Sequence, residues 1–92
     1  MVYVLSKLDV ESYDRWKTFF DKRSATRENS GSNEAHLFRN SENPHEVFIL
    51  FEWDNMGNAR KYMESDNVRK YLQKADAEIA SITYLDEQEI SI

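Results

Sequence analysis

Residues 39 to 54 read Arg39-Asn40-Ser41-Glu42-Asn43-Pro44-His45-Glu46-Val47-Phe48-Ile49-Leu50-Phe51-Glu52-Trp53-Asp54. The first part is a polar turn centred on Asn43-Pro44, and the second part is a strand that is apolar at every position from Val47 to Phe51. An antiparallel strand with one face in water should alternate apolar and polar residues. Both faces of the sheet that contains this strand are therefore expected to be covered.

The chain is too short to cover both faces by itself. Its 92 residues predict a single domain, spanning residues 1–92, whose helices cover one face of the sheet. The other face is expected to pack against a second copy of the chain. Such a homodimer should bury on the order of 1,500 Å² or more of surface in total.

Composition argues against several classes of partner and chemistry. Acidic residues outnumber basic ones by 17 to 12, and no basic cluster offsets the net charge of −5, so neither nucleic acid nor an anionic membrane is an expected partner. Cysteine is absent, which excludes disulfides, thiolate metal sites and cysteine nucleophiles. The first residues have strand composition and lack the features of a signal peptide, so a cytoplasmic location is expected.

The spacing of apolar residues predicts four strands and two helical regions. The first helix is expected to begin at an Asp9 cap, and the second at an Asn55 cap with a bend at Ser65-Asp66. With both helices on one face of one antiparallel sheet, this βαββαβ order is the ferredoxin-like α+β fold. The expected elements are a strand over residues 2–8, a helix to about residue 27, strands over 34–40 and 47–51, helical segments over 56–75 and a strand over 79–92.

Two residues are candidates for proton transfer. His36, in the expected second strand, could face the space between sheet and helices and act as a general acid or base; the alternative is a half-exposed histidine paired with a carboxylate. Glu52 is the charge that follows the apolar run, and it is a candidate base if it faces the interior. The alternative for Glu52 is an ion pair with Arg39 or a lysine across the hairpin.

Aromatic side chains are candidates for binding a ring. Tyr13, Trp16 and Tyr62 combine an apolar body with a polar tip, and could hold an aromatic ligand by stacking and hydrogen bonds; Trp53 and Tyr84 are further candidates. The alternative for these residues is a purely structural place in the core. The two histidines have no carboxylate or histidine at metal-binding spacing, and no glycine-rich turn is present, so no metal, haem, flavin or other cofactor is expected.

Several segments together resemble the dimeric α/β-barrel superfamily and, within it, the small antibiotic-biosynthesis-monooxygenase-like and cyclase-like proteins. The resemblance covers nearly the whole chain and implies a pocket between sheet and helices, and a homodimer in which two sheets face each other as a barrel. The segments are Tyr13-Asp14-Arg15-Trp16-Lys17, Leu37-Phe38-Arg39-Asn40, Asn43-Pro44-His45-Glu46-Val47, Phe51-Glu52-Trp53-Asp54, Ala59-Arg60 and Ser65-Asp66.

The resemblance also bears on activity. The superfamily includes cofactor-free monooxygenases acting on polyketide quinols, haem-degrading enzymes, aromatic cyclases and stress-induced proteins. The haem-degrading branch is not indicated, because Tyr62 and Leu72 stand where that branch has a tryptophan and a haem-ligating histidine. The expected function is a cofactor-free monooxygenase or cyclase acting on an aromatic or polyketide-type substrate, with His36 or Glu52 taking the proton. The alternative is a non-catalytic homodimer that binds a ligand or serves in a stress response.

Overall fold

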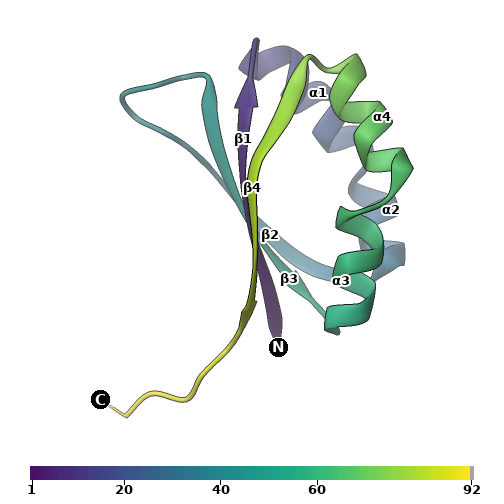
Figure 1. Ribbon diagram of the computed structural model, residues 1–92, viewed down its shortest axis with the longest axis vertical. Coiled ribbons are helices and arrows are strands. Elements are labelled where there is room, and N and C mark those ends of the chain that lie inside the picture. Colours follow the sequence, from purple (N-terminus) through teal and green to yellow (C-terminus); the bar gives the residue numbers. More distant parts are fainter. Residues whose placement is uncertain (92) are drawn as a thin grey trace.

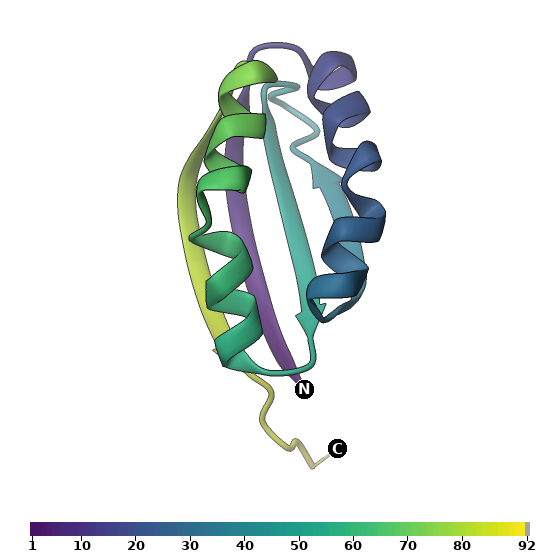
Figure 2. The ribbon, with the colours of Figure 1, turned by 90° about the vertical axis from the view of Figure 1, so that its right-hand side faces the viewer.

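The computed structural model describes residues 1–91, in which one antiparallel sheet carries a layer of helices on a single face (Figure 1, Figure 2). The strand order in the sheet is β2-β3-β1-β4. This arrangement confirms the ferredoxin-like α+β fold, with the first expected helix divided into two segments and the second divided at the expected bend. The elements are β1 (Val2–Val10), α1 (Tyr13–Lys22), α2 (Ser24–Ser30), β2 (Ser32–Arg39), β3 (Glu46–Trp53), α3 (Met56–Met63), α4 (Asp66–Lys74) and β4 (Ala77–Asp86).

The first helical region begins later than the sequence predicts. Strand β1 continues to Val10, whose side chain is buried and whose backbone pairs with β4, so Asp9 lies in the strand and is not the cap. Ser12 is the N-cap of α1, and its side chain accepts a hydrogen bond from the Arg15 backbone N–H. A break at Arg23 then separates α1 from α2.

The second helical region follows the prediction more closely. Asn55 caps α3, and its side chain accepts a hydrogen bond from the Asn58 backbone N–H. The expected bend is present, but Ser65 caps α4 in place of Asp66, because the Ser65 hydroxyl is the group that accepts from the Val68 N–H. Both segments turn their apolar residues towards the sheet.

The last strand ends earlier than expected. β4 stops at Asp86, which pairs with Val2 at the start of β1, so no strand remains for later residues to pair with. Residues 87–91 follow without strand structure, and Ile90 is 79% exposed. Ile92, which the sequence assigned to this strand, lies outside the described residues.

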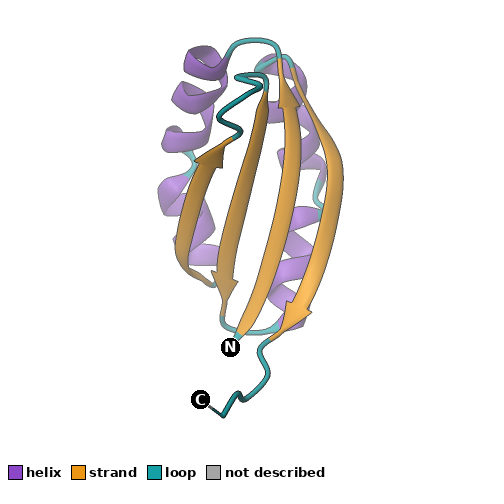
Figure 3. Ribbon diagram, turned by 90° about the vertical axis from the view of Figure 1, so that its left-hand side faces the viewer, coloured by secondary structure: helices purple, strands orange, loops and turns teal. Residues whose placement is uncertain are grey.

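The two faces of the sheet differ in cover. Cross-strand partners share a face, and the helix-facing row of β3 is fully buried, with Val47 and Trp53 at its two ends. Figure 3 shows the opposite face, which no helix covers. Phe48 and Leu50 of β3 lie there beside Leu5 of β1, which is 37% exposed. Apolar residues on both sides of β3 therefore explain the unbroken apolar run.

Candidate functional site

The space between sheet and helices is almost filled by side chains. Its cavity volume is about 10 Å³, close to the minimum that holds one water molecule. Phe20 and Met63 are among the residues around it, as are Ser6 and Tyr62. In this state the layer has no room for an aromatic ligand.

Six aromatic rings form a continuous row through this layer, from α1 to α3. The ring centroids of successive members lie 4.9 to 6.4 Å apart, in the range of favourable aromatic contacts. Much of the aromatic content of the chain therefore stabilises the core by packing. The row consists of Tyr13, Trp16, Phe20, Phe51, Trp53 and Tyr62.

Three polar atoms in the same layer lack partners. Within residues 1–91, the Ser6 Oγ and the indole Nε1 atoms of Trp16 and Trp53 are buried and have no partner at hydrogen-bonding geometry, although the Tyr71 phenol lies near the Trp16 indole. All three residues have 0% exposure. An unsatisfied buried donor or acceptor costs about 1–3 kcal/mol, so a core selected only for packing would not retain three of them.

Tyr71 adds a further polar group at the edge of this layer. Burial, together with the nearby Tyr62, raises the pKa of Tyr71 to about 12, and the Trp16 indole and the charges of Arg27 and Arg23 oppose this shift. The Arg23 guanidinium lies 4.9 Å from the centre of the Tyr71 ring. The phenol of Tyr71 therefore stays protonated, and able to donate, throughout the physiological pH range.

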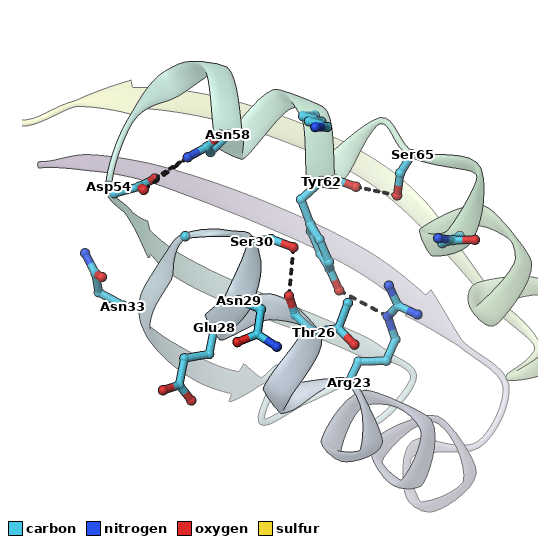
Figure 4. A pocket seen from close by; sticks show the side chains of 13 residues that line it. Arg23, Thr26, Glu28, Asn29, Ser30, Asn33, Asp54, Asn58, Tyr62 and Ser65 are labelled. Atoms are coloured by element: carbon cyan, nitrogen blue, oxygen red, sulfur yellow. Dashed lines mark hydrogen bonds between the residues drawn. The ribbon is translucent and has the colours of Figure 1, made fainter.

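A larger, open cleft lies between α2 and α3 (Figure 4). Its volume is about 670 Å³. Tyr62 extends into it from α3, and its hydroxyl accepts a hydrogen bond of 3.1 Å from Arg23 Nε. The remaining lining is polar: Thr26, Glu28, Asn29, Ser30, Gly31, Asn33, Asp54, Asn58, Lys61, Ser65 and Asn67.

Tyr62 connects the two spaces. Among residues 1–91, it alone lines both the cleft and the small interior cavity, and it packs against Trp53 at 5.3 Å between ring centroids. Arg23 restrains it by the hydrogen bond and by contact with the ring face at 5.5 Å. The Tyr62 ring therefore lies at the boundary between the interior and the cleft.

Comparison with family models gives a match to antibiotic biosynthesis monooxygenase over residues 1–74. The chain belongs to this family. No curated protein matches the sequence. The family domain here includes both helical regions of the site, from α1 to α4.

Solved structures show the same fold at low sequence identity. SnoaB, a cofactor-independent oxygenase from Streptomyces nogalater, has a TM-score of 0.77 at 11% identity, covering 97% of this chain and 94% of that chain. A protein from Deinococcus radiodurans assigned to the antibiotic biosynthesis monooxygenases has a TM-score of 0.70 at 21% identity, covering 100% and 98%. A conserved protein from Methanosarcina mazei has a TM-score of 0.61 at 19% identity, covering 95% and 92%.

Within this member of the antibiotic biosynthesis monooxygenase family, the predicted ring-binding residues lie on the helix side of the sheet. Trp16 is fully buried, Tyr62 is 7% exposed, and Tyr13 packs at the edge of the core. Tyr13 and Trp16 contact each other at 5.9 Å between ring centroids, whereas Tyr62 is reached only through the other rings of the row.

The predicted position of His36 is wrong. His36 pairs with Leu50 in the sheet register and therefore faces the uncovered side of the sheet, away from Trp16 and Tyr62. Its side chain is 50% exposed, and its Nε2 lies 3.5 Å from Glu34 Oε1. The alternative of a half-exposed histidine beside a carboxylate is confirmed.

Glu52 also faces the uncovered side. Its cross-strand partners are Tyr3 on β1 and Glu34 on β2, so it does not face the interior as a catalytic base would. Arg39 is not its partner either, because the Arg39 guanidinium lies 4.5 Å from the centre of the Tyr13 ring on the helix side. Successive side chains along a strand point to opposite faces of the sheet, and His36 and Glu52 both occupy positions that face the uncovered side.

Ser6 and Arg23 are site residues that sequence reasoning missed. Ser6 could have been predicted from the sequence. Every second side chain of β1 is buried, and Ser6 is the polar residue among these otherwise apolar positions. Arg23 has no such signal, since its role depends on the break between α1 and α2 and on the approach of α3.

The described residues contain neither a metal-binding cluster nor a membrane-spanning helix. Within residues 1–91, no group of three or more histidine, aspartate or glutamate side chains is arranged to hold a metal ion. In the same part of the chain, no helix combines the length and apolar character needed to span a bilayer.

Proposed function

We propose that this protein is a cofactor-independent monooxygenase that acts on a phenolic, polyketide-type substrate held between sheet and helices. Membership of the antibiotic biosynthesis monooxygenase family supports this class of activity. The observation that carries the proposal is the set of unpaired polar atoms of Ser6, Trp16 and Trp53 in a fully buried layer. Groups of this kind are typical of sites that await a ligand.

The chemistry needs few protein groups. Indole N–H groups only donate hydrogen bonds, so Trp16 and Trp53 are suited to stabilise the oxygen of a phenolate. The phenol gives its proton to solvent, and the phenolate passes one electron to dioxygen. The two radicals combine to form a carbon–oxygen bond, and the peroxide anion takes a proton back from solvent to become a hydroperoxide. Elimination of water then breaks the O–O bond and the C–H bond at the same carbon, which leaves a carbonyl group. One oxygen atom enters the product and the other leaves as water.

Entry of the substrate requires the interior to open. The interior holds about 10 Å³, and Tyr62 separates it from the cleft of about 670 Å³. We assign Tyr62 the role of the movable wall, which shields the reacting ring from water when it returns.

A serine substitution tests the proposal. Because the Ser6 hydroxyl has no partner, Ser6→Ala should leave the ligand-free protein as stable or raise its melting temperature, yet weaken binding of a phenolic ligand by about fivefold or more. Ser41→Ala, in the exposed turn between β2 and β3, is the matched control and should change neither quantity. The measurements are thermal unfolding with and without hydroquinones and aromatic acids, and oxygen consumption with the ligands that bind.

The same assay distinguishes the alternative function. The nearly filled interior favours a non-catalytic homodimer that binds no ligand in this layer. If no phenol or hydroquinone raises the melting temperature or consumes oxygen, and Ser6→Ala only stabilises the fold, the enzyme proposal is wrong and the alternative stands.

We also propose that the working unit is a homodimer formed through the uncovered face of the sheet. Leu5, Phe38 and Leu85 are 37–57% exposed there. The Lys7 and Glu46 charges on this face pair with each other at 3.3 Å, so their burial would not leave a lone charge. In this arrangement His36 and Glu52 lie at the subunit interface, and their role is in association instead of proton transfer.

A further inference from the structure

The cleft between α2 and α3 has a lining that the proposed chemistry does not use. Its volume of about 670 Å³ is in the range of small-molecule sites. Neutral amide and hydroxyl side chains dominate its walls, in contrast to the mostly apolar walls of a typical pocket for a flat aromatic ligand. These neutral polar residues are Thr26, Asn29, Ser30, Asn33, Asn58, Ser65 and Asn67.

The charged residues of the cleft balance one another. Arg23 and Lys61 are opposed by Glu28 and Asp54, which leaves no net charge to attract an ion. A phosphate group would favour a positive site with arginine free to bind it, and a divalent cation would favour several carboxylates. Arg23 is instead engaged with the hydroxyl of Tyr62. The lining therefore favours a neutral ligand.

Two hydroxyl groups of the lining are oriented. Ser30 Oγ donates to the Thr26 carbonyl at 2.7 Å, and Ser65 Oγ donates to the Tyr62 carbonyl at 2.7 Å. Because both hydroxyl protons are used, these two oxygens can only accept from a ligand, and Ser65 already accepts one hydrogen bond from the Val68 N–H. A ligand that meets them must bring O–H or N–H donors.

Donors are available from the amides around them. The side chains of Asn29, Asn33 and Asn67 make no hydrogen bond with another group of residues 1–91, so each offers a free N–H₂ and a free carbonyl oxygen. A ligand with several hydroxyl groups both donates and accepts, and it complements this mixture better than a carboxylate or an ammonium group, which does only one.

Asp54 provides a fixed acceptor at the end of the cleft. Its Oδ1 accepts from the Asn55 backbone N–H at 2.7 Å, and Asn58 Nδ2 lies 3.1 Å from its Oδ2. A Cβ on Gly31 would lie 2.5 Å from Asp54 Oδ1, so the glycine allows the carboxylate to occupy this place. A carboxylate beside an amide, both already oriented, suits two neighbouring hydroxyl groups at small entropic cost.

We propose that the cleft between α2 and α3 binds a sugar ring, either as a free glycoside or as the sugar carried by an aromatic ligand. The juxtaposition of a fixed Asp54–Asn58 pair with accepting hydroxyls and free amides recognises a neutral ligand that carries several hydroxyl groups. Binding is independent of the proposed oxygenase chemistry, because it requires neither turnover nor opening at Tyr62.

Nuclear magnetic resonance titration of the full chain tests the proposal. The probes are methyl glucoside, methyl galactoside and methyl rhamnoside, the corresponding phenyl glycosides, and inorganic phosphate, each added to about 50 mM. Methyl glycosides should shift the backbone amides of Gly31, Asp54 and Asn58, with dissociation constants of about 1–10 mM. Tighter binding of a phenyl glycoside identifies the sugar of an aromatic ligand as the source, and equal binding identifies the sugar alone.

Two variants within the cleft and one control variant outside it complete the test. Asn33→Ala removes a side chain with no internal hydrogen bond, so it should weaken sugar binding by about threefold or more without lowering the melting temperature. Asn58→Ala should weaken binding more, because it also releases Asp54. Gln73→Ala, which removes an amide on α4 outside the cleft, should change nothing. The proposal is overturned if no methyl glycoside shifts the cleft amides, if phosphate binds there more tightly, or if both asparagine variants bind as the native chain does.

Discussion

At the scale of single residues, Tyr62 is the side chain on which access to the interior depends. Tyr62→Phe removes the hydrogen bond from Arg23 but keeps the ring, so we expect a loss of about 1 kcal/mol in unfolding free energy and faster entry of a phenolic ligand. Tyr84→Phe is the matched control. The Tyr84 hydroxyl also donates a hydrogen bond to a side chain, that of Glu64, but Tyr84 lines neither the cleft nor the interior cavity. Stopped-flow tryptophan fluorescence measures the entry rate. Equal rates in both variants would contradict the role of Tyr62.

Glu46 gives a prediction for the dependence of stability on pH. The hydrogen bond from Asn40 lowers the pKa of the Glu46 carboxyl below its ordinary value; burial opposes this shift and Lys7 reinforces it. A carboxyl whose pKa is lower in the folded state stabilises the fold above its unfolded pKa, and this contribution is lost as the pH falls through the folded pKa. Glu46→Gln should therefore lower the melting temperature at neutral pH, and the difference should vanish in acid. A difference that persists or grows in acid would show that the charge is not the cause.

At the scale of elements, Gly31 ends α2 and sets the wall of the cleft. Its φ of 114° lies in the left-handed region, and Gly31→Ala would also bring a methyl group against Asp54. We expect a destabilisation of about 2–3 kcal/mol. In an Asp54→Ala background the added methyl group no longer meets the carboxylate, so Gly31→Ala should destabilise the fold by less. The remaining loss of unfolding free energy comes from the left-handed backbone conformation. Denaturant unfolding of the two single variants and the double variant measures this coupling, and strict additivity would contradict the contact.

At the scale of the whole molecule, the uncovered sheet face governs assembly. Leu50→Lys introduces a charge between Leu5 and His36 in the sheet register, so the variant should sediment as a monomer or aggregate while the native chain sediments as a dimer. Ser41→Lys, in the exposed turn between β2 and β3, adds the same charge away from this face and should stay dimeric. A native chain that sediments as a monomer at micromolar concentration would refute the proposed assembly.

The architecture could be predicted from local patterns in the sequence. The apolar run from Val47 to Phe51 predicts a strand with two apolar faces, and the β3 side chains are apolar on both. The cap at Asn55 and the bend near Ser65 were also predictable, because capping depends on residues within one turn of the helix. A cap is harder to predict where the same residue can also pair in a strand. Asp9 is an example, because it was expected to cap a helix and instead pairs with β4.

The residues of the candidate site could not be predicted in the same way, because their positions depend on contacts between distant parts of the chain. His36 and Glu52 lie on the uncovered face because side chains alternate along a strand, and a shift of one residue exchanges the two faces. The volume left in the interior depends on how Phe20, Met63 and Tyr62 pack together, which no local pattern encodes. The cleft likewise exists only where α2 approaches α3, since residues far apart in the chain form its walls, and contacts of that kind are fixed by packing of the whole molecule.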